Sequence, residues 1–211
     1  MLITAVEPRR KSLCAIYIDG EFALNLDAQV TLEQRIQPGL ELDDERLREL
    51  IQLSDTRRAK EKALWLMSYR DHSKNELRKK LERDTSPEAA ESTLERLEEL
   101  GLIDDERYAQ RLAKELFETK KLSSRAVKYK LIEKGIDKQL AEDIVCEFSP
   151  DEEQLAYELL NKKYYRSMFD EKGRKRAIAA LQRSGYSWSC IKEAMSRFDD
   201  ENDICDEEDD Y

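Results

Sequence analysis

The chain has 211 residues, of which 40% are apolar and 40% charged, with only six Gly and four Pro. This composition allows a buried core and is typical of long, solvated helices. The sequence has no run of 18 apolar residues, which argues against a membrane-spanning helix, and its first residues, MLITAVEPRRK, include no apolar stretch long enough for a signal peptide. We therefore expect a soluble, cytoplasmic protein.

The net charge of −10 is unevenly distributed along the chain. Residues 1–56 carry 11 acids and 6 bases, and residues 199–211 carry 9 acids and no base. The part between them, 57–198, carries 31 bases and 27 acids, so it has a charge of +4. A mildly basic body is thus flanked by an acidic head and a strongly acidic tail. We expect the tail to be disordered, because acids at this density repel one another.

The first 56 residues predict a small subdomain of strands and one helix. Asp19-Gly20 separates two β-prone runs in the segment 10–27, and Asp-Gly is a strong signal for a two-residue hairpin turn. Residues 3–6 are candidates for a third strand. Asp43 or Asp44 can cap a following helix, whose apolar residues recur at helical spacing. These residues are Leu47, Leu50, Ile51 and Leu53.

From residue 57 onward the apolar pattern is helical and repeats with an offset of 50 residues. Leu77 and Leu81 correspond to Val127 and Leu131, and then to Ala177 and Leu181. Gly135 and Gly185 occupy equivalent positions after the second and third middle helices. Each copy divides into three helices too short to bury enough surface alone, so stacked triplets with shared cores are expected. The alternative is a coincidence between unrelated amphipathic helices.

The fold class that follows is mainly α, with three tandem three-helix repeats in an elongated, curved array after a small β-hairpin and helix. The expected helices are 57–70, 74–84, 87–100, 104–119, 124–134, 138–148, 151–168, 172–184 and 188–198. The expected divisions are an N-terminal subdomain at 1–56, repeats at 57–102, 103–149 and 150–198, and the tail at 199–211.

No constellation of catalytic or metal-binding residues stands out. Cys14, Cys146, Cys190 and Cys205 are scattered, and His72 is the single histidine, whereas a zinc site or a disulfide framework needs clustered ligands. We interpret His72 as a surface or capping residue. The acidic cluster 104–106 suits the positive end of a helix better than a metal ion. Glycine-rich nucleotide loops are missing, so we expect no enzyme, metal or cofactor.

The basic residues of the three middle helices are the candidate site. Bases presented from equivalent helices form a stripe that suits a phosphate backbone or an acidic partner. The alternative is that these bases form solvated faces balanced by nearby acids, and the sequence favours neither interpretation over the other. The candidates are Arg78, Lys79 and Lys80 in the first repeat, Arg125, Lys128 and Lys130 in the second, and Arg174, Lys175 and Arg176 in the third.

Six aromatic residues accompany these bases along the repeats. Their helical spacing favours core packing for most of them, and stacking on nucleic-acid bases is the alternative. They are Trp65, Tyr69, Tyr108, Tyr129, Tyr164 and Tyr165.

Several linked motifs resemble the RecX family. The segments ALWLMSYR at 63–70 and SKNELRKKL at 73–81 are similar to its first repeat, and LEELGLIDDERYA at 97–109 looks like its most recognisable stretch. The segment KGID at 134–137 fits the end of its second middle helix, and YIDGEFAL at 17–24 is similar to the N-terminal extension of many members. The resemblance covers residues 1–198.

The resemblance implies a regulator, most often an inhibitor, of the RecA recombinase in DNA repair and the SOS response. It implies binding in the groove of the RecA–single-stranded DNA filament, which limits filament extension, strand exchange and ATP hydrolysis. We expect a monomer that meets single-stranded DNA mainly through RecA. The alternatives are a nucleic-acid-binding module that acts without RecA and a general helical scaffold. The acidic tail either covers the basic stripe or only aids solubility.

Overall fold

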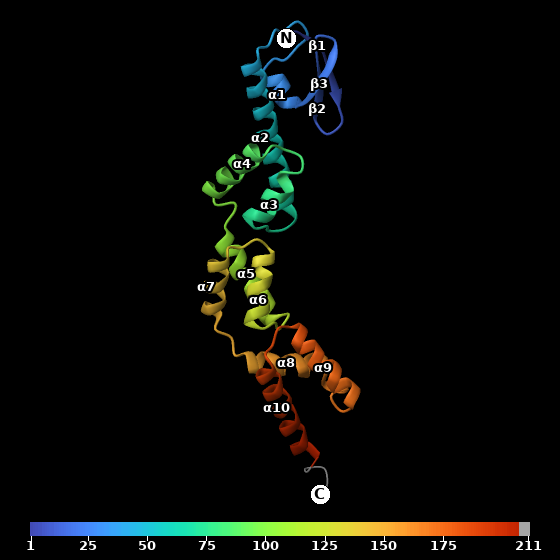
Figure 1. The fold of residues 1–211 in the computed structure, drawn as a ribbon, viewed down its shortest axis with the longest axis vertical. Coiled ribbons are helices and arrows are strands. Elements are labelled where there is room, and N and C mark those ends of the chain that lie inside the picture. Colours follow the sequence, from blue (N-terminus) through green and yellow to red (C-terminus); the bar gives the residue numbers. More distant parts are fainter. Residues whose placement is uncertain (207–211) are drawn as a thin grey trace. The chain divides into compact units, whose positions relative to one another are not determined.

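The computed structural model describes residues 1–206, which form two compact units, Met1–Asp104 and a second that begins at Asp105 (Figure 1). The first contains β1 (Ile3–Arg9), β2 (Leu13–Ile18), β3 (Glu21–Asp27), α1 (Ala28–Glu33), α2 (Asp44–Tyr69), α3 (Lys74–Leu81) and α4 (Pro87–Glu99). The second contains α5 (Asp105–Glu118), α6 (Ser124–Glu133), α7 (Lys138–Phe148), α8 (Glu152–Lys163), the 3-10 turn η1 (Tyr165–Ser167), α9 (Glu171–Arg183) and α10 (Trp188–Asp206).

The N-terminal strands form an antiparallel sheet in the order β1-β2-β3. The predicted hairpin is confirmed, since Ile18 pairs with Glu21 across a turn in which Asp19 and Gly20 have φ angles of 51° and 90°. One face of the sheet packs with the start of α2, where Leu50 is fully buried with Ile3. The predicted third strand is present and longer than expected, because it continues to Arg9.

Helix α2 runs across the predicted domain boundary at residues 56 and 57, so the helix expected at 57–70 begins earlier, at Asp44 (Figure 1). Ser54 faces the head, where its Oγ accepts a hydrogen bond of 2.8 Å from the amide of Asp27. Ala63 packs with α3 and α4 instead. These two residues are about two and a half turns apart and thus lie on opposite sides of the helix. The two halves of α2 bury opposite faces, which makes one helix part of both the head and the first triplet.

Three apolar cores follow the three predicted triplets of helices. Leu77, Leu81 and Leu94 are fully buried between α2, α3 and α4. In the second unit one core joins α5, α6 and α7, and another joins α8, α9 and α10. The mainly helical fold with a small N-terminal sheet is thus confirmed. The boundaries at residues 102 and 149 stay a prediction, since the compact units divide the chain only after Asp104.

Short polar signals end and begin these helices as the sequence indicated. The Ser73 side chain accepts a hydrogen bond from the amide of Glu76, and Ser123 caps α6 in the same way through the amide of Ala126. Pro87 begins α4. Proline is tolerated at this position because the N–H that it lacks would have no acceptor within the helix. Asp137 caps α7 directly after the turn at Gly135, whose φ is 89°. The caps therefore fix where each triplet turns.

The end of the chain differs from the expectation. Helix α10 continues to Asp206, so residues 199–206 are helical and the predicted disordered tail is wrong for that stretch. Two of its acids form ion pairs: Asp199 with Arg174 at 2.5 Å, and Glu201 with Arg197 at 2.9 Å. The rest of the predicted tail, 207–211, lies outside the described residues. Helix α8 also ends at Lys163, five residues before the expected end.

Candidate interaction surface on the middle helices

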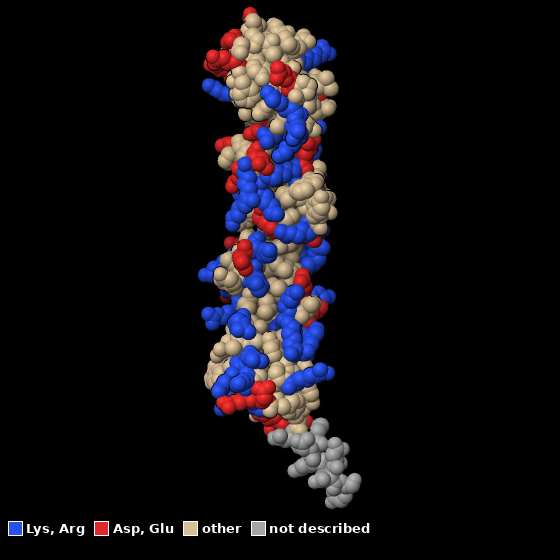
Figure 2. Space-filling model, turned by 90° about the vertical axis from the view of Figure 1, so that its right-hand side faces the viewer, with Lys and Arg blue, Asp and Glu red and all other residues tan. Residues whose placement is uncertain are grey.

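The middle helix of each triplet, namely α3, α6 and α9, buries one face and presents bases on the other. Val127 and Leu131 of α6, for example, are fully buried, and Arg125 and Lys130 are exposed. On the face that Figure 2 shows, Lys and Arg predominate over Asp and Glu within each unit. The predicted basic faces are therefore present on each unit, and the surroundings of each base decide whether it is available.

Three of the nine predicted bases are bound to acids of the third helix in their own triplet. Arg78 Nε lies 2.8 Å from Glu91 Oε2, and a second bond of 3.0 Å joins Nη2 to Oε1. The hydrogen bond from Arg78 lowers the pKa of Glu91 below its ordinary value. These contacts join middle helix to third helix, so Arg78 has a structural role. The other two pairs are Lys128–Glu142 at 2.7 Å and Arg174–Asp199 at 2.5 Å.

Two further bases pair with acids one turn earlier in the same helix. Lys80 lies 3.7 Å from Glu76, and Lys175 lies 2.5 Å from Glu171. Pairs at this spacing are common on exposed helix faces and contribute little to stability. For these bases, as for the three bound across helices, the alternative of a balanced, solvated face describes the structure well.

Four predicted bases have no acid within ion-pair distance in the described part of the chain. All four side chains are exposed, and they come from all three middle helices. They are Lys79 of α3, Arg125 and Lys130 of α6, and Arg176 of α9. We call these four residues the free basic set. They are the part of the predicted site that can meet an anionic partner without first breaking an ion pair.

Four of the six predicted aromatic residues are exposed, which corrects the expectation of core packing for them. Trp65, Tyr69 and Tyr129 are 58%, 72% and 70% exposed. Trp65 and Tyr69 form an edge-to-face pair on α2 with ring centroids 4.9 Å apart. Tyr165 is also exposed, whereas Tyr108 and Tyr164 pack against cores as predicted. Tyr129 is flanked in sequence by Lys128 and Lys130, an arrangement that suits stacking on a base next to a phosphate.

His72 is buried, so the interpretation as a surface residue is wrong. Its Nδ1 lies 3.1 Å from Glu76 Oε2 at the start of α3. Burial acts to raise the pKa of Glu76, but hydrogen bonds and charge from Arg70 and His72 outweigh it and lower this pKa to about 2.

Asp105 and Glu106 lie in the first turn of α5, where negative charge is favourable. Among the side chains that the structure describes, no three His, Cys, Asp or Glu residues are grouped as metal ligands. The helices of the described part include none with the length and hydropathy of a membrane span.

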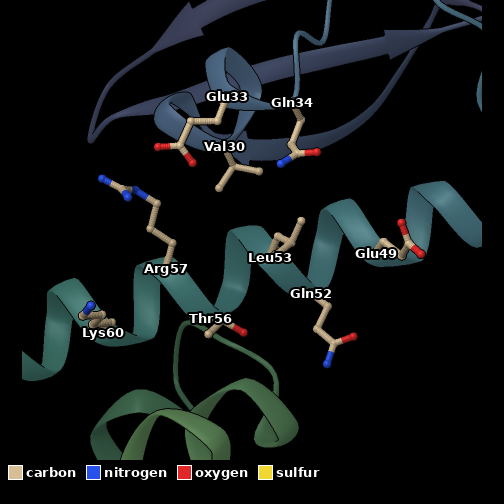
Figure 3. Close-up of a pocket in the computed structure, with 9 residues that line it drawn as sticks. All are labelled: Val30, Glu33, Gln34, Glu49, Gln52, Leu53, Thr56, Arg57 and Lys60. Carbon is tan, nitrogen blue, oxygen red and sulfur yellow. The ribbon is translucent and has the colours of Figure 1, made fainter. Parts of the chain in front are cut away.

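Two pockets were not predicted from the sequence, because each is formed by residues far apart in the chain. The first, of about 490 Å³, lies between α1 and α2. Figure 3 shows Val30 and Leu53 pointing toward each other across it, with Glu33 and Arg57 at one end. Arg57 is already bound to Asp27 at 3.0 Å and to Glu61 at 3.2 Å. The ion pairs of Arg57 thus connect this pocket to the contact between Asp27 of the head and helix α2.

The second pocket, of about 440 Å³, lies in the second unit and includes Lys130 of the free basic set. It is formed by α5, α6, the residue after the end of α9, and Lys163 of α8. Its three leucines come from α5 and the following loop, and four lysines surround them. The sequence shows a lysine near each of several helix ends, but it does not indicate which of these lysines come together in the folded chain.

Comparisons with known proteins agree with this architecture. Residues 59–97 match the family model described as the first three-helix domain of RecX, and residues 104–144 match the model of its second three-helix domain. These ranges correspond to the triplets α2–α4 and α5–α7. The chain belongs to the RecX family. The shared domains cover the middle helices α3 and α6, and therefore three of the four residues of the free basic set.

Relatives in the RecX family extend the likeness along the chain. The regulatory protein RecX of Limosilactobacillus reuteri (strain DSM 20016) is 28% identical over 185 residues, which cover 86% of this chain and 70% of that protein. That of Clostridium perfringens (strain SM101) is 27% identical over 203 residues, covering 92% and 95%. A crystal structure of a regulatory protein RecX is 27% identical with a TM-score of 0.59, covering 91% and 98% of the two chains. RecX from Lactobacillus salivarius shares the fold at 24% identity, with a TM-score of 0.58 over 69% of this chain and 97% of that one.

Proposed function

We propose that this chain regulates the RecA recombinase by binding the RecA–single-stranded DNA filament, where it limits filament extension, strand exchange and ATP hydrolysis. Membership of the RecX family supports a regulatory role. The observation that supports the site is the free basic set, Lys79, Arg125, Lys130 and Arg176, because these bases are exposed and are bound to no acid whose side chain the structure describes. Such bases attract an anionic filament without the cost of breaking an ion pair.

The mechanism that follows is steric and electrostatic. The basic faces of the middle helices contact the filament, and the body of the triplets occupies space that the next RecA subunit or an incoming DNA strand needs. The paired bases Arg78, Lys128 and Arg174 hold their triplets together and contribute little direct contact. No bond is made or broken in the regulator, which acts as a monomer and needs no cofactor.

A RecA ATPase assay on preformed filaments tests this proposal. The variant in which all four residues of the free basic set are changed to Glu should lose most of the inhibition and keep its circular dichroism spectrum. The matched control reverses four exposed bases outside the middle helices, Arg96, Lys114, Lys138 and Lys192, and should inhibit as the unmodified chain does. Full inhibition by the first variant would remove the basic set from the mechanism, and no effect of the unmodified chain on RecA would remove the proposed function.

Direct binding of single-stranded DNA is the second candidate, and the exposed Tyr129 between two lysines favours it. A salt titration separates the candidates, because affinity for DNA alone falls steeply with salt when it depends on phosphate contacts. Tight, salt-sensitive binding to a thymidine oligonucleotide, weakened by Tyr129→Ala, supports a module that acts on DNA itself. Weak binding to the oligonucleotide together with tight binding to the filament supports regulation through RecA.

A further inference from the structure

The leucine and lysine pocket of the second unit has the chemistry of a peptide-binding site. Its volume of about 440 Å³ is in the range of pockets that hold ligands in proteins, roughly 300–1,000 Å³. Leu112, Leu116 and Leu122 provide its apolar surface. Leu116 is buried, and the other two are half-buried against the core of α5, α6 and α7. An apolar side chain placed on these leucines would extend an existing core.

The rim of this pocket is strongly basic. Lys120, Lys130 and Lys163 are exposed, and they have no acid within ion-pair distance among residues 1–202, whose side chains the structure describes. Lys134 is a fourth lysine in the lining, and Glu133 is the single acid there. Two other lysines near these elements are paired with acids: Lys121 forms an ion pair with Glu158, and Lys128 with Glu142. Four lysines against one acid give the pocket lining an excess of positive charge, which favours an anionic occupant.

The walls of the pocket are held in place before any ligand arrives. The amide of Ser123 donates to the carbonyl of Ser184 at 3.1 Å, which joins the start of α6 to the end of α9. The Tyr186 hydroxyl donates to the carbonyl of Lys121 at 2.8 Å. These bonds fix the loop that carries Leu122 against the loop that carries Ser184. A preformed site loses little conformational entropy on binding.

The lining favours an acidic peptide over nucleic acid. The pocket's lining residues include no aromatic side chain on which a base would stack and no arginine for two-pronged contact with a phosphate. Leucines under a ring of lysines instead match a segment that presents apolar side chains between carboxylates, as in the docking of amphipathic helices into grooves. We propose that this pocket binds an acidic protein segment with leucine-like anchor residues. The site shares Lys130 with the surface proposed above, but its binding does not depend on that function.

Fluorescence anisotropy with the full chain and no RecA tests the site directly. The probe is a fluorescein-labelled peptide of four Glu-Glu-Leu repeats, and the comparison peptide is four Glu-Glu-Ser repeats. We expect saturable binding of the leucine peptide and at least about tenfold weaker binding of the serine peptide, since only the first can fill the apolar floor. The double variant Lys120→Glu/Lys163→Glu should weaken leucine-peptide binding at least about tenfold. These exposed lysines are outside the free basic set, so RecA regulation has no part in the result.

The control variant Lys114→Glu/Lys138→Glu carries the same change in net charge on exposed lysines outside the pocket and should bind the leucine peptide normally. Three results would each overturn the proposal. One is no binding of the leucine peptide to the unmodified chain, and another is equal loss in the pocket and control variants. The third is tighter binding of a thymidine oligonucleotide with the same dependence on Lys120 and Lys163, which would assign the pocket to nucleic acid.

Discussion

Gly185 lies so close to Ser123 that a Cβ atom on the glycine would meet the serine Oγ at 2.4 Å. Gly185 follows the end of α9 with a φ of +91°, and Ser123 caps α6. The contact joins the second and third triplets inside one compact unit, next to the hydrogen bond between the Ser123 amide and the Ser184 carbonyl. Glycine is thus required here for both its conformation and its lack of a side chain.

Gly185→Ala should destabilise the second unit by about 3 kcal/mol, because it adds left-handed strain to a steric clash. Gly39→Ala is the matched control, since Gly39 has a φ of +92° and open space where the Cβ would lie. That variant should lose only about 1 kcal/mol. Urea unfolding followed by circular dichroism measures both. Equal losses would show that the contact with Ser123 adds nothing.

Acid should weaken the first unit through Glu76. The pKa of this carboxyl is about 2 in the folded chain against an ordinary 4.5. Its contribution to the free energy of unfolding is therefore complete above pH 4.5 and is lost as the pH falls toward 2. The loss should reach about 3 kcal/mol. Glu76→Gln should be less stable at pH 7 and should show a flatter dependence between pH 5 and 2; an unchanged slope would contradict this role.

A break at the centre of α2 should uncouple the packing of its first half on the head from the packing of its second half on α3 and α4. Thr56→Pro removes a helical hydrogen bond between the half that packs on the head and the half that packs on α3 and α4, at a cost of about 3 kcal/mol. Asp44→Pro places the same residue at the first position of the helix, where proline is tolerated. We expect a large loss of stability in the first variant only, measured by urea unfolding. Similar stability in both would show that the head and the triplet do not depend on a continuous helix.

Neighbouring lysines of α6 should respond differently to charge reversal. Lys128→Glu replaces the base whose Nζ lies 2.7 Å from Glu142 Oε2 with an acid, so repulsion should lower the urea midpoint, and Glu142→Lys in the same chain should restore it. Lys130→Glu should leave the midpoint unchanged and weaken inhibition of the RecA ATPase, because Lys130 is exposed and has no acidic partner among the side chains that the structure describes. Loss of stability in Lys130→Glu, or none in Lys128→Glu, would reverse these assignments.

Asp199→Asn tests whether the acidic end of the chain restrains the basic surface. Asp199 is bound to Arg174 of α9 at 2.5 Å, so removing its charge should increase affinity for the filament about twofold at low salt. Glu193→Gln removes an exposed charge elsewhere on α10 and serves as the control. An equal effect of the two variants would mean that only net charge matters.

Much of this protein followed from local sequence patterns. The Asp19-Gly20 hairpin, the caps at Ser73, Ser123 and Asp137, and the buried positions such as Leu77 and Leu131 are set by residues within a few positions of one another. The linked motifs of the first and second triplets were sufficient to indicate the RecX family. Each of these signals depends on short-range geometry, which the order of residues specifies directly.

Tertiary structure decided which of these residues are available. The sequence predicted two elements where α2 is one helix, because the apolar face of α2 changes sides along its length. Only the packing shows that this single helix contributes to two cores. The nine predicted bases look alike in sequence, yet Arg78 is bound by Glu91 and Lys130 is not, since each partner depends on how the third helix packs. The leucine and lysine pocket also joins residues from separate helices. Periodicity determines which face of a helix is apolar, whereas pairing and pockets depend on long-range contacts that local patterns do not encode.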